Sequence, residues 1–144
     1  RDEHPSGVID TILSGLVVPD DPGQAGYLHH LFHVVGDIAQ RGKAIILGRG
    51  VNWFLNPKYG LRLRIIAPLE QRIEWVATHE GLDAESARKR VLVHDGEQRA
   101  FVRQVYRRDI EDPLGYDMIL NMGGLSVDIA IETVIASLAQ KFAA

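Results

Sequence analysis

One short segment constrains the fold more than any other part of this 144-residue chain. Residues 44–47 read Ala-Ile-Ile-Leu and run directly into Gly48-Arg49-Gly50. A continuous apolar run of this length, rich in β-branched residues, is typical of a strand buried on both faces of a parallel sheet. Open α/β sheets bind ligands at the carboxyl edge of such strands. Arginine pairs with phosphate oxygens, and glycine lets backbone approach closely, so this edge suits a phosphate.

Strand-like and helical segments alternate along the chain. Strands are predicted at residues 44–48, 61–67 and 116–121. Helices are predicted at residues 5–16, 24–40, 68–79, 84–106 and 126–142. Gly42 and Gly81 suit helix C-termini, whereas Asp83 and Ser126 suit N-caps. The alternation predicts an α/β fold with parallel strands.

The composition excludes several classes of function. A length of 144 residues with 46% hydrophobic content predicts one domain with one core, and the net charge of −3 argues against DNA or RNA as a partner. The chain has no cysteine, which removes disulfides and thiolate metal sites. The sequence shows neither a membrane-length apolar run nor a signal-peptide pattern, so a cytoplasmic protein without a membrane partner is expected.

A near match to a phosphate-binding loop lies at residues 36–44. Five residues separate Gly36 from Gly42, one more than the Walker pattern has, and Ala44 replaces its hydroxyl residue. The segment also precedes a predicted strand instead of following one. We therefore interpret it as a helix C-cap with a dipole-matched lysine, and the 144 residues contain no credible triphosphate loop.

Three histidines cluster in the second predicted helix. His29 and His33 are four residues apart, as zinc ligands can be, and His30 lies between them. No carboxylate has the metalloprotease spacing, and Asp37 is the nearby acid. We interpret the cluster as surface histidines on the polar face of a helix. The alternative, the metal site of a metal-dependent hydrolase, is less favoured, so no metal site is predicted.

Asp95, Arg99 and Arg103 lie four residues apart and share one face of the helix predicted at 84–106. Two interpretations stay open. The face is a solvated helix surface with an Asp–Arg pair, or it is a mobile arm that brings arginines onto phosphates during transfer.

Several segments occur in an order that resembles a known family. They are residues 44–50, Arg-Ile-Ile-Ala-Pro-Leu-Glu-Gln-Arg-Ile at 64–73, Glu-Gly-Leu at 80–82, Asp-Gly-Glu-Gln-Arg-Ala-Phe-Val-Arg at 95–103 and Asp-Pro-Leu-Gly-Tyr-Asp-Met-Ile-Leu-Asn-Met at 112–122. From about Pro5 onward, the chain resembles the cytidylate kinase-like family of P-loop nucleoside monophosphate kinases. The ordered set is more specific than any one motif in it.

The resemblance implies a P-loop kinase fold, ATP and Mg²⁺ as cofactors of the full-length parent, and a CMP-like nucleoside monophosphate as acceptor. Gly48, Arg49 and Gly50 would bind the monophosphate. Residues 84–110 would form the lid, where Arg99 and Arg103 reach the transferring phosphoryl and Asp95 orients them. The loop beside the adenine of ATP would be formed by Asn121, Met122, Gly123 and Gly124.

The chain departs from the family at three places. Gly50 stands where bacterial cytidylate kinases have Asp, and Asn121-Met122 replaces Asp-Thr. The family's first strand, its phosphate loop and the following helix are absent from these residues, and the chain opens on Arg1. We therefore expect a truncated domain that is inactive alone and binds no cofactor tightly.

The absent strand would lie between the strands at 44–48 and 61–67. Their open edges would pair directly, borrow a strand from another copy as a homo-oligomer or strand-swapped dimer, or associate with the missing piece. The alternative to a kinase is a non-catalytic ligand-sensing or assembly module derived from the same fold, which the departures at Gly50 and Asn121-Met122 suit.

Overall fold

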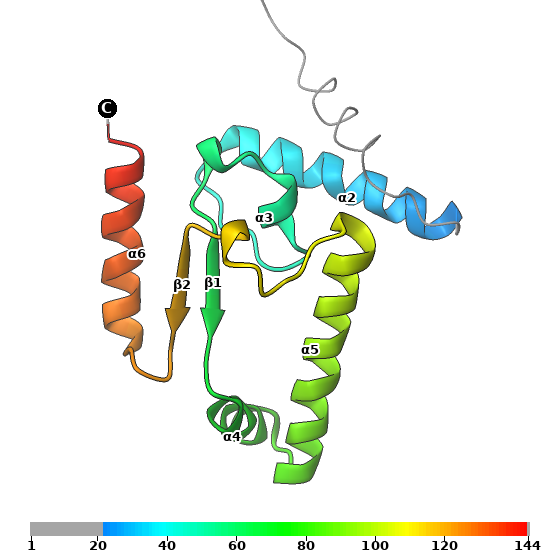
Figure 1. Cartoon of the computed structure of the whole chain (residues 1–144), viewed down its shortest axis with the longest axis vertical. Coiled ribbons are helices and arrows are strands. Elements are labelled where there is room, and N and C mark those ends of the chain that lie inside the picture. The colour runs from blue at the N-terminus through cyan, green and yellow to red at the C-terminus, as the bar shows by residue number, and fades with distance from the viewer. Residues whose placement is uncertain (1–21, 144) are drawn as a thin grey trace, which may run out of the picture. The chain divides into compact units, whose positions relative to one another are not determined.

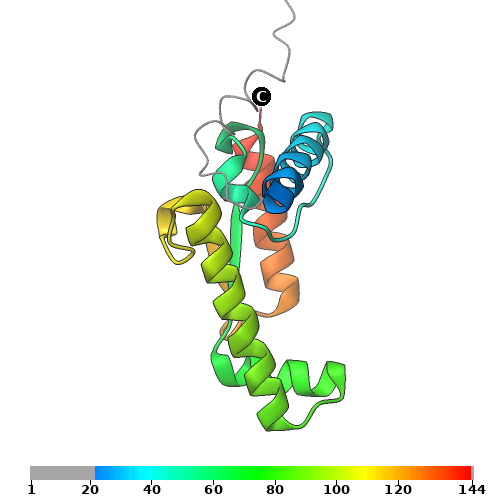
Figure 2. The ribbon, with the colours of Figure 1, turned by 90° about the vertical axis from the view of Figure 1, so that its right-hand side faces the viewer.

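The computed structural model describes residues 22–143, and this part of the chain forms two compact units. The first contains residues 22–60 and 99–112, and the second contains residues 61–98 and 113–143. Helix α5 (Ala84–Tyr106) is continuous and contributes to both units (Figure 2). The helix predicted at 5–16 lies outside the described residues.

The first unit is helical and has an aromatic core. It contains α2 (Pro22–Arg41), α3 (Val51–Phe54), the 3-10 turn η1 (Pro57–Tyr59) and the last two turns of α5. Phe32 is fully buried and stacks on Phe54 with ring centroids 4.6 Å apart. The other buried side chains of this core are Leu28, Val35, Val102, Val105 and Tyr106. The core thus joins α2 and α3 to the C-terminal end of α5.

The prediction of a strand at residues 44–48 is wrong. Residues 44–47 adopt no regular secondary structure, and the side chains of Ile45 and Leu47 are 92% and 86% exposed. Ile46 packs against the aromatic core, so the run is buried on one side only. A doubly buried strand needs a hydrogen-bonded neighbour on each edge, and residues 22–143 supply none to this segment.

The second unit contains a parallel two-stranded sheet, as expected from the two later strand predictions. β1 (Leu63–Ile66) pairs with β2 (Met118–Asn121), and Leu63 lies opposite Met118 (Figure 1). The carbonyl oxygens of Arg62 and Ile66 accept hydrogen bonds from the β2 side. Because backbone groups alternate between strand edges, those of Leu63 and Ile65 face the other edge, where no strand is present among the residues described.

The helices of the second unit begin and end at the predicted signals. α4 (Leu69–Glu80) ends at Gly81, whose φ of 67° is left-handed. Asp83 accepts a hydrogen bond from the Ser86 backbone N–H near the start of α5, and η2 (Pro113–Gly115) precedes β2. α6 (Val127–Lys141) is capped by the Ser126 hydroxyl. Ile73, Ala87 and Val91 form a small core between α4 and α5.

α6 leaves much of its apolar side exposed. Among its apolar residues, Ile129, Ile135 and Leu138 are 51%, 61% and 45% exposed. No helix between residues 22 and 143 combines the length and hydrophobicity needed to cross a membrane. The α/β class is correct, with a smaller sheet than the sequence predicted.

Asp117 links the start of the sheet to the end of α6. Its carboxylate pairs with Arg62 at 3.1 Å and with Lys141 at 3.0 Å. Burial alone would raise the pKa of this carboxyl, but hydrogen bonds from the Arg62 side chain, the Arg62 backbone and Lys141 outweigh burial and lower the pKa to about 2. The ionised carboxylate therefore stabilises the folded unit.

Asp117→Asn is expected to reduce the free energy of unfolding by about 1–2 kcal/mol at pH 7, since the three groups are only partly shielded from water. Because the folded-state pKa lies below the unfolded value, the stabilisation is complete above about pH 4 and is lost as the pH falls towards 2. Urea denaturation between pH 2 and 7 measures the difference. Asp37→Asn, an exposed residue of α2, is the control. A pH-independent difference between Asp117→Asn and the parent chain would contradict this account.

Candidate functional site

The Gly48-Arg49-Gly50 segment is held in an unusual backbone conformation. All three residues have positive φ, at 77°, 57° and 62° respectively. Glycine adopts this region freely, whereas a non-glycine residue is strained there by roughly 1 kcal/mol. Such strain persists where the surrounding structure imposes it, and it gathers at binding sites.

Tyr106 imposes this conformation. Its hydroxyl donates a hydrogen bond to the Arg49 carbonyl oxygen at 2.9 Å, and its ring packs beside Phe32 and Phe101. Burial raises the pKa of the Tyr106 phenol above its ordinary value, so the hydroxyl stays protonated and remains a donor. A Cβ atom added to Gly50 would lie 2.6 Å from Tyr106 Cε2. The Tyr106 ring therefore explains why glycine stands at position 50.

The Arg49 side chain is exposed and directed by an aromatic ring. Its guanidinium carbon lies 5.6 Å from the centroid of the Phe101 ring. A cation over an aromatic face is favourable, and this contact leaves the guanidinium edge able to donate to an anion. The Tyr106 hydrogen bond to the Arg49 backbone and the Phe101 ring thus position the exposed Arg49 guanidinium.

The two predicted lid arginines lie in the same unit as Arg49. Arg99 approaches Glu111 at 3.4 Å, and both side chains are about half exposed. Arg103 is exposed, and no ion pair holds its side chain within residues 22–143. Gly48, Arg49, Gly50, Arg99 and Arg103 therefore all belong to the first unit. Exposed arginines with weak or no partners can move onto an anion at small cost.

Asp95 belongs to the second unit and pairs with a residue that the sequence did not single out. Its carboxylate accepts two hydrogen bonds from Arg72 of α4, at 2.8 and 2.9 Å. The hydrogen bonds that Arg72 donates to Asp95 raise the pKa of Arg72, and Arg72 Nε also donates to the Ala67 carbonyl oxygen. Asp95 thus orients Arg72, and its predicted role towards Arg99 and Arg103 stays a prediction.

The loop of Asn121, Met122, Gly123 and Gly124 is tightly folded. Gly123 N–H donates to Asn121 Oδ1 at 2.9 Å, and Met122 N–H donates to the Ile66 carbonyl at 2.7 Å. A Cβ atom on Gly123 would lie 2.5 Å from Pro68 Cδ, so the loop packs closely on the start of α4. The loop therefore has a fixed shape beside the carboxyl end of the sheet.

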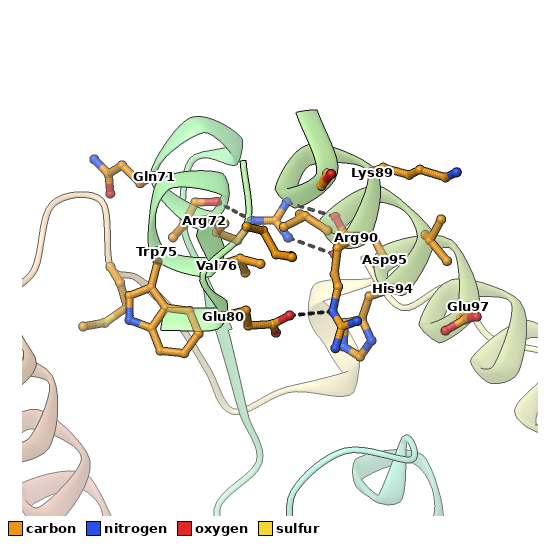
Figure 3. A pocket seen from close by; sticks show the side chains of 16 residues that line it. Gln71, Arg72, Trp75, Val76, Glu80, Lys89, Arg90, His94, Asp95 and Glu97 are labelled. Atoms are coloured by element: carbon orange, nitrogen blue, oxygen red, sulfur yellow. Dashed lines mark hydrogen bonds and ion pairs between the residues drawn. The ribbon is translucent and has the colours of Figure 1, made fainter. Parts of the chain in front are cut away.

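A groove of about 1070 Å³ lies within the second unit (Figure 3). Met122, Ala67 and residues of α4 and α5 line it. Figure 3 shows two ion pairs across it, Arg72 with Asp95 and Glu80 with Arg90. Trp75 stands at one side of the groove and is 60% exposed. An exposed tryptophan near a predicted nucleotide loop is a signal that sequence analysis missed.

Two of the three histidines of α2, His29 and His33, contact each other. The rings of His29 and His33 are 4.4 Å apart and meet edge to face. Within the described residues, no group of three or more His, Cys, Asp or Glu side chains is arranged to hold a metal ion.

Known proteins resemble this chain over most of its length. The model of the cytidylate kinase-like family matches residues 2–124. A cytidylate kinase from Methanocaldococcus jannaschii is 26% identical over 64% of the chain and 53% of that protein. One from Natronomonas pharaonis is 31% identical over 74% of the chain and 56% of that protein. A uronate isomerase from Corynebacterium glutamicum is 26% identical over 68% of the chain but 19% of that protein.

The chain thus spans about half the length of the cytidylate kinases it matches. No solved structure matches it significantly. The family match covers far more than half of the chain and includes Arg49, the arginines of α5 and the loop of Asn121, Met122, Gly123 and Gly124. The chain belongs to the cytidylate kinase-like family.

Proposed function

We propose that these residues form the acceptor-binding and lid parts of a cytoplasmic nucleoside monophosphate kinase, which transfers a phosphoryl group from ATP to a CMP-like acceptor. The observation that carries the proposal is the accessible Arg49, held by Tyr106 and Phe101 in the same unit as Arg99 and Arg103. Family membership supports it. The 144 residues contain no Walker motif, so a phosphate loop must come from outside them, and the chain alone should be inactive.

The proposed mechanism is positioning with charge neutralisation. Arg49 binds the phosphate of the acceptor and sets its attacking oxygen in place. Arg99 and Arg103 then neutralise the charge that spreads over the transferring phosphoryl group. No covalent enzyme intermediate is needed, because the acceptor oxygen displaces ADP directly. When bound together with ATP, Mg²⁺ would supply further charge neutralisation on the donor phosphates.

Arg99→Ala and Arg103→Ala test the lid role in the complete gene product. Each is expected to lower kcat about a hundredfold with a smaller effect on the KM for CMP, because the arginines act mainly in the transition state. Arg88→Ala is the control, since Arg88 lies on the same helix and pairs with Glu70. Steady-state ATP consumption with CMP as acceptor gives kcat and KM for all three variants. Unchanged kcat in both α5 variants would remove the lid arginines from the mechanism.

The second candidate is a non-catalytic ligand-sensing or assembly module. The close contact between Gly50 and Tyr106 favours it, because the Tyr106 ring fills the space that an aspartate at position 50 would need. Such a module would still bind a phosphate at Arg49 but would not turn over.

We also propose that the open strand edges make the chain associate with another strand. Residues 44–47 expose Ile45 and Leu47, and β1 turns the backbone of Leu63 and Ile65 to an edge without a partner in the described chain. The 144-residue chain is therefore expected to sediment as a dimer or larger species. Sedimentation velocity measures this, and a monomer at every concentration would contradict it.

A further inference from the structure

Helix α2 has a second apolar face beside the one that enters the core of the first unit. Its residues, called the α2 row below, are Tyr27, Leu31, Val34 and Ile38. Successive members are four, three and four residues apart, so they form one row along the helix. Leu31 is half-buried against the core, whereas Tyr27, Val34 and Ile38 are 48%, 41% and 39% exposed. An exposed apolar row of about three turns is typical of a surface that another segment covers.

The segment that precedes α2 has the complementary pattern. A helix is predicted at residues 5–16, and its apolar positions are Val8, Ile9, Ile12, Leu13 and Leu16. In a helix these five side chains fall within an arc of about 140°, and Asp10, Thr11 and Ser14 fall on the other side. A helix of this length is marginal in water by itself and depends on a surface against which it can bury its apolar side.

The connection between the two segments favours this occupant over a second copy of the chain. Residues 17–21 include Pro19 and lead into Pro22, the first residue of α2. A connection of this length is typical of two antiparallel helices in contact. It can extend about 17 Å, whereas the axes of packed helices lie about 8–10 Å apart. Such a tether gives the segment an effective concentration on the order of millimolar at the α2 row, which a second copy rarely reaches.

We infer that residues 5–16 dock as an antiparallel helix on the α2 row. Leu16 then lies beside Tyr27, the first member of the row. Because paired positions of antiparallel helices advance in opposite directions along the chain, Ile9 lies beside Val34. The residues between them meet in the same register, so Ile12 contacts Leu31. Docking therefore buries the exposed part of the α2 row within the same chain.

Docking acts on Arg49 through the aromatic core. Phe32 of α2 stacks on Phe54, and its ring centroid lies 6.0 Å from that of Tyr106. The Tyr106 hydroxyl donates a hydrogen bond to the Arg49 carbonyl oxygen. A segment that stabilises α2 therefore also stabilises the conformation of Arg49, without contacting that residue. The inference concerns contacts within the chain, so it does not rest on the proposed function.

The 144 residues contain no cysteine, which permits a disulfide test. The chain with Ile9→Cys and Val34→Cys is expected to form an intramolecular disulfide with oxidised glutathione, because facing positions of packed helices come close to the required distance. The matched control combines Thr11→Cys with Val34→Cys and should stay largely reduced, since Thr11 lies on the polar side of the predicted helix. Non-reducing electrophoresis and intact mass separate the products. Equal yields from the two pairs, or disulfides only between two chains, would overturn the inference.

Urea denaturation of cysteine-free variants gives a second measurement. Ile12→Asp is expected to lower the urea midpoint of the first unit by about 1 M, because it places a charge in the apolar contact. Thr11→Asp is its control and should leave the midpoint nearly unchanged. Trp53 packs against the core of this unit, so its fluorescence in a Trp75→Phe background follows the transition.

A double-mutant cycle separates contact between the two helices from an effect on either helix alone. Val34→Ser, a mild change at an exposed position of α2, should also lower the urea midpoint. Because both changes disrupt the same contact, the chain with Ile12→Asp and Val34→Ser should lose little more than the worse single variant. Fully additive losses would overturn the inference, as would equal midpoints for Ile12→Asp and Thr11→Asp. None of these outcomes depends on kinase activity, so failure here leaves the proposed function standing.

Discussion

Arg49→Ala lowers kcat/KM for CMP by about a hundredfold to a thousandfold in the complete gene product, with a raised KM for CMP and an unchanged KM for ATP. The reason is geometric. The Arg49 backbone is fixed by Tyr106 and its side chain lies over Phe101, so the guanidinium is preorganised to bind phosphate. Alanine removes both the charge and the paired donors, and neither neighbour can replace them.

Arg49→Lys is expected to recover part of the loss, because lysine keeps the charge but lacks the planar fork. Arg41→Ala is the matched control: Arg41 is an exposed arginine in the last turn of α2. Steady-state kinetics with CMP and ATP varied separately show which substrate's KM changes. A loss confined to the KM for ATP would place Arg49 at the donor instead, and no loss at all would remove it from the site.

Gly50→Ala reduces the free energy of unfolding of the first unit by about 2–4 kcal/mol, whereas Gly48→Ala reduces it by about 1 kcal/mol. Both glycines have left-handed φ, so both alanine variants carry the same kind of backbone strain. They differ in their surroundings. A Cβ atom at position 48 meets no atom within 4 Å, while one at position 50 meets the Tyr106 ring at 2.6 Å.

The Tyr106 ring cannot move aside cheaply, since its hydroxyl donates a hydrogen bond to the Arg49 carbonyl oxygen and its ring contacts Phe32 and Phe101. The difference between the two variants therefore measures steric overlap alone. Trp53 packs against the same core, so its fluorescence in a Trp75→Phe background reports unfolding of this unit in urea. Equal destabilisation of the two variants would show that Tyr106 does not constrain position 50.

Local signals in the sequence were enough to predict most helices. Gly81 ends α4 and Ser126 begins α6 because their backbone geometry and side-chain bonds act within one turn. β1 and β2 were also recognisable, and their parallel pairing follows from the helices between them. These features depend on few distant residues.

Residues 44–47 show where local pattern fails. Their composition predicts a buried strand, but strand formation depends on neighbours that residues 22–143 do not provide. The contacts that shape the site are likewise long-range. Tyr106 bonds to Arg49 across 57 positions and Asp95 to Arg72 across 23, and no periodicity in the sequence encodes either partner. The sequence identifies Arg49 and the α5 arginines as candidates, but it does not identify Tyr106 and Phe101, which hold Arg49.

Phosphoryl transfer by the complete gene product shows whether this chain belongs to a nucleoside monophosphate kinase. Labelled ATP and Mg²⁺ are incubated with CMP, UMP, AMP and dCMP in turn, and the label is followed into the diphosphate. We expect label to appear in CDP and Arg49→Ala to abolish nearly all of it. ATP binding without labelling of any acceptor would contradict the kinase account and leave the non-catalytic module as the explanation of this fold.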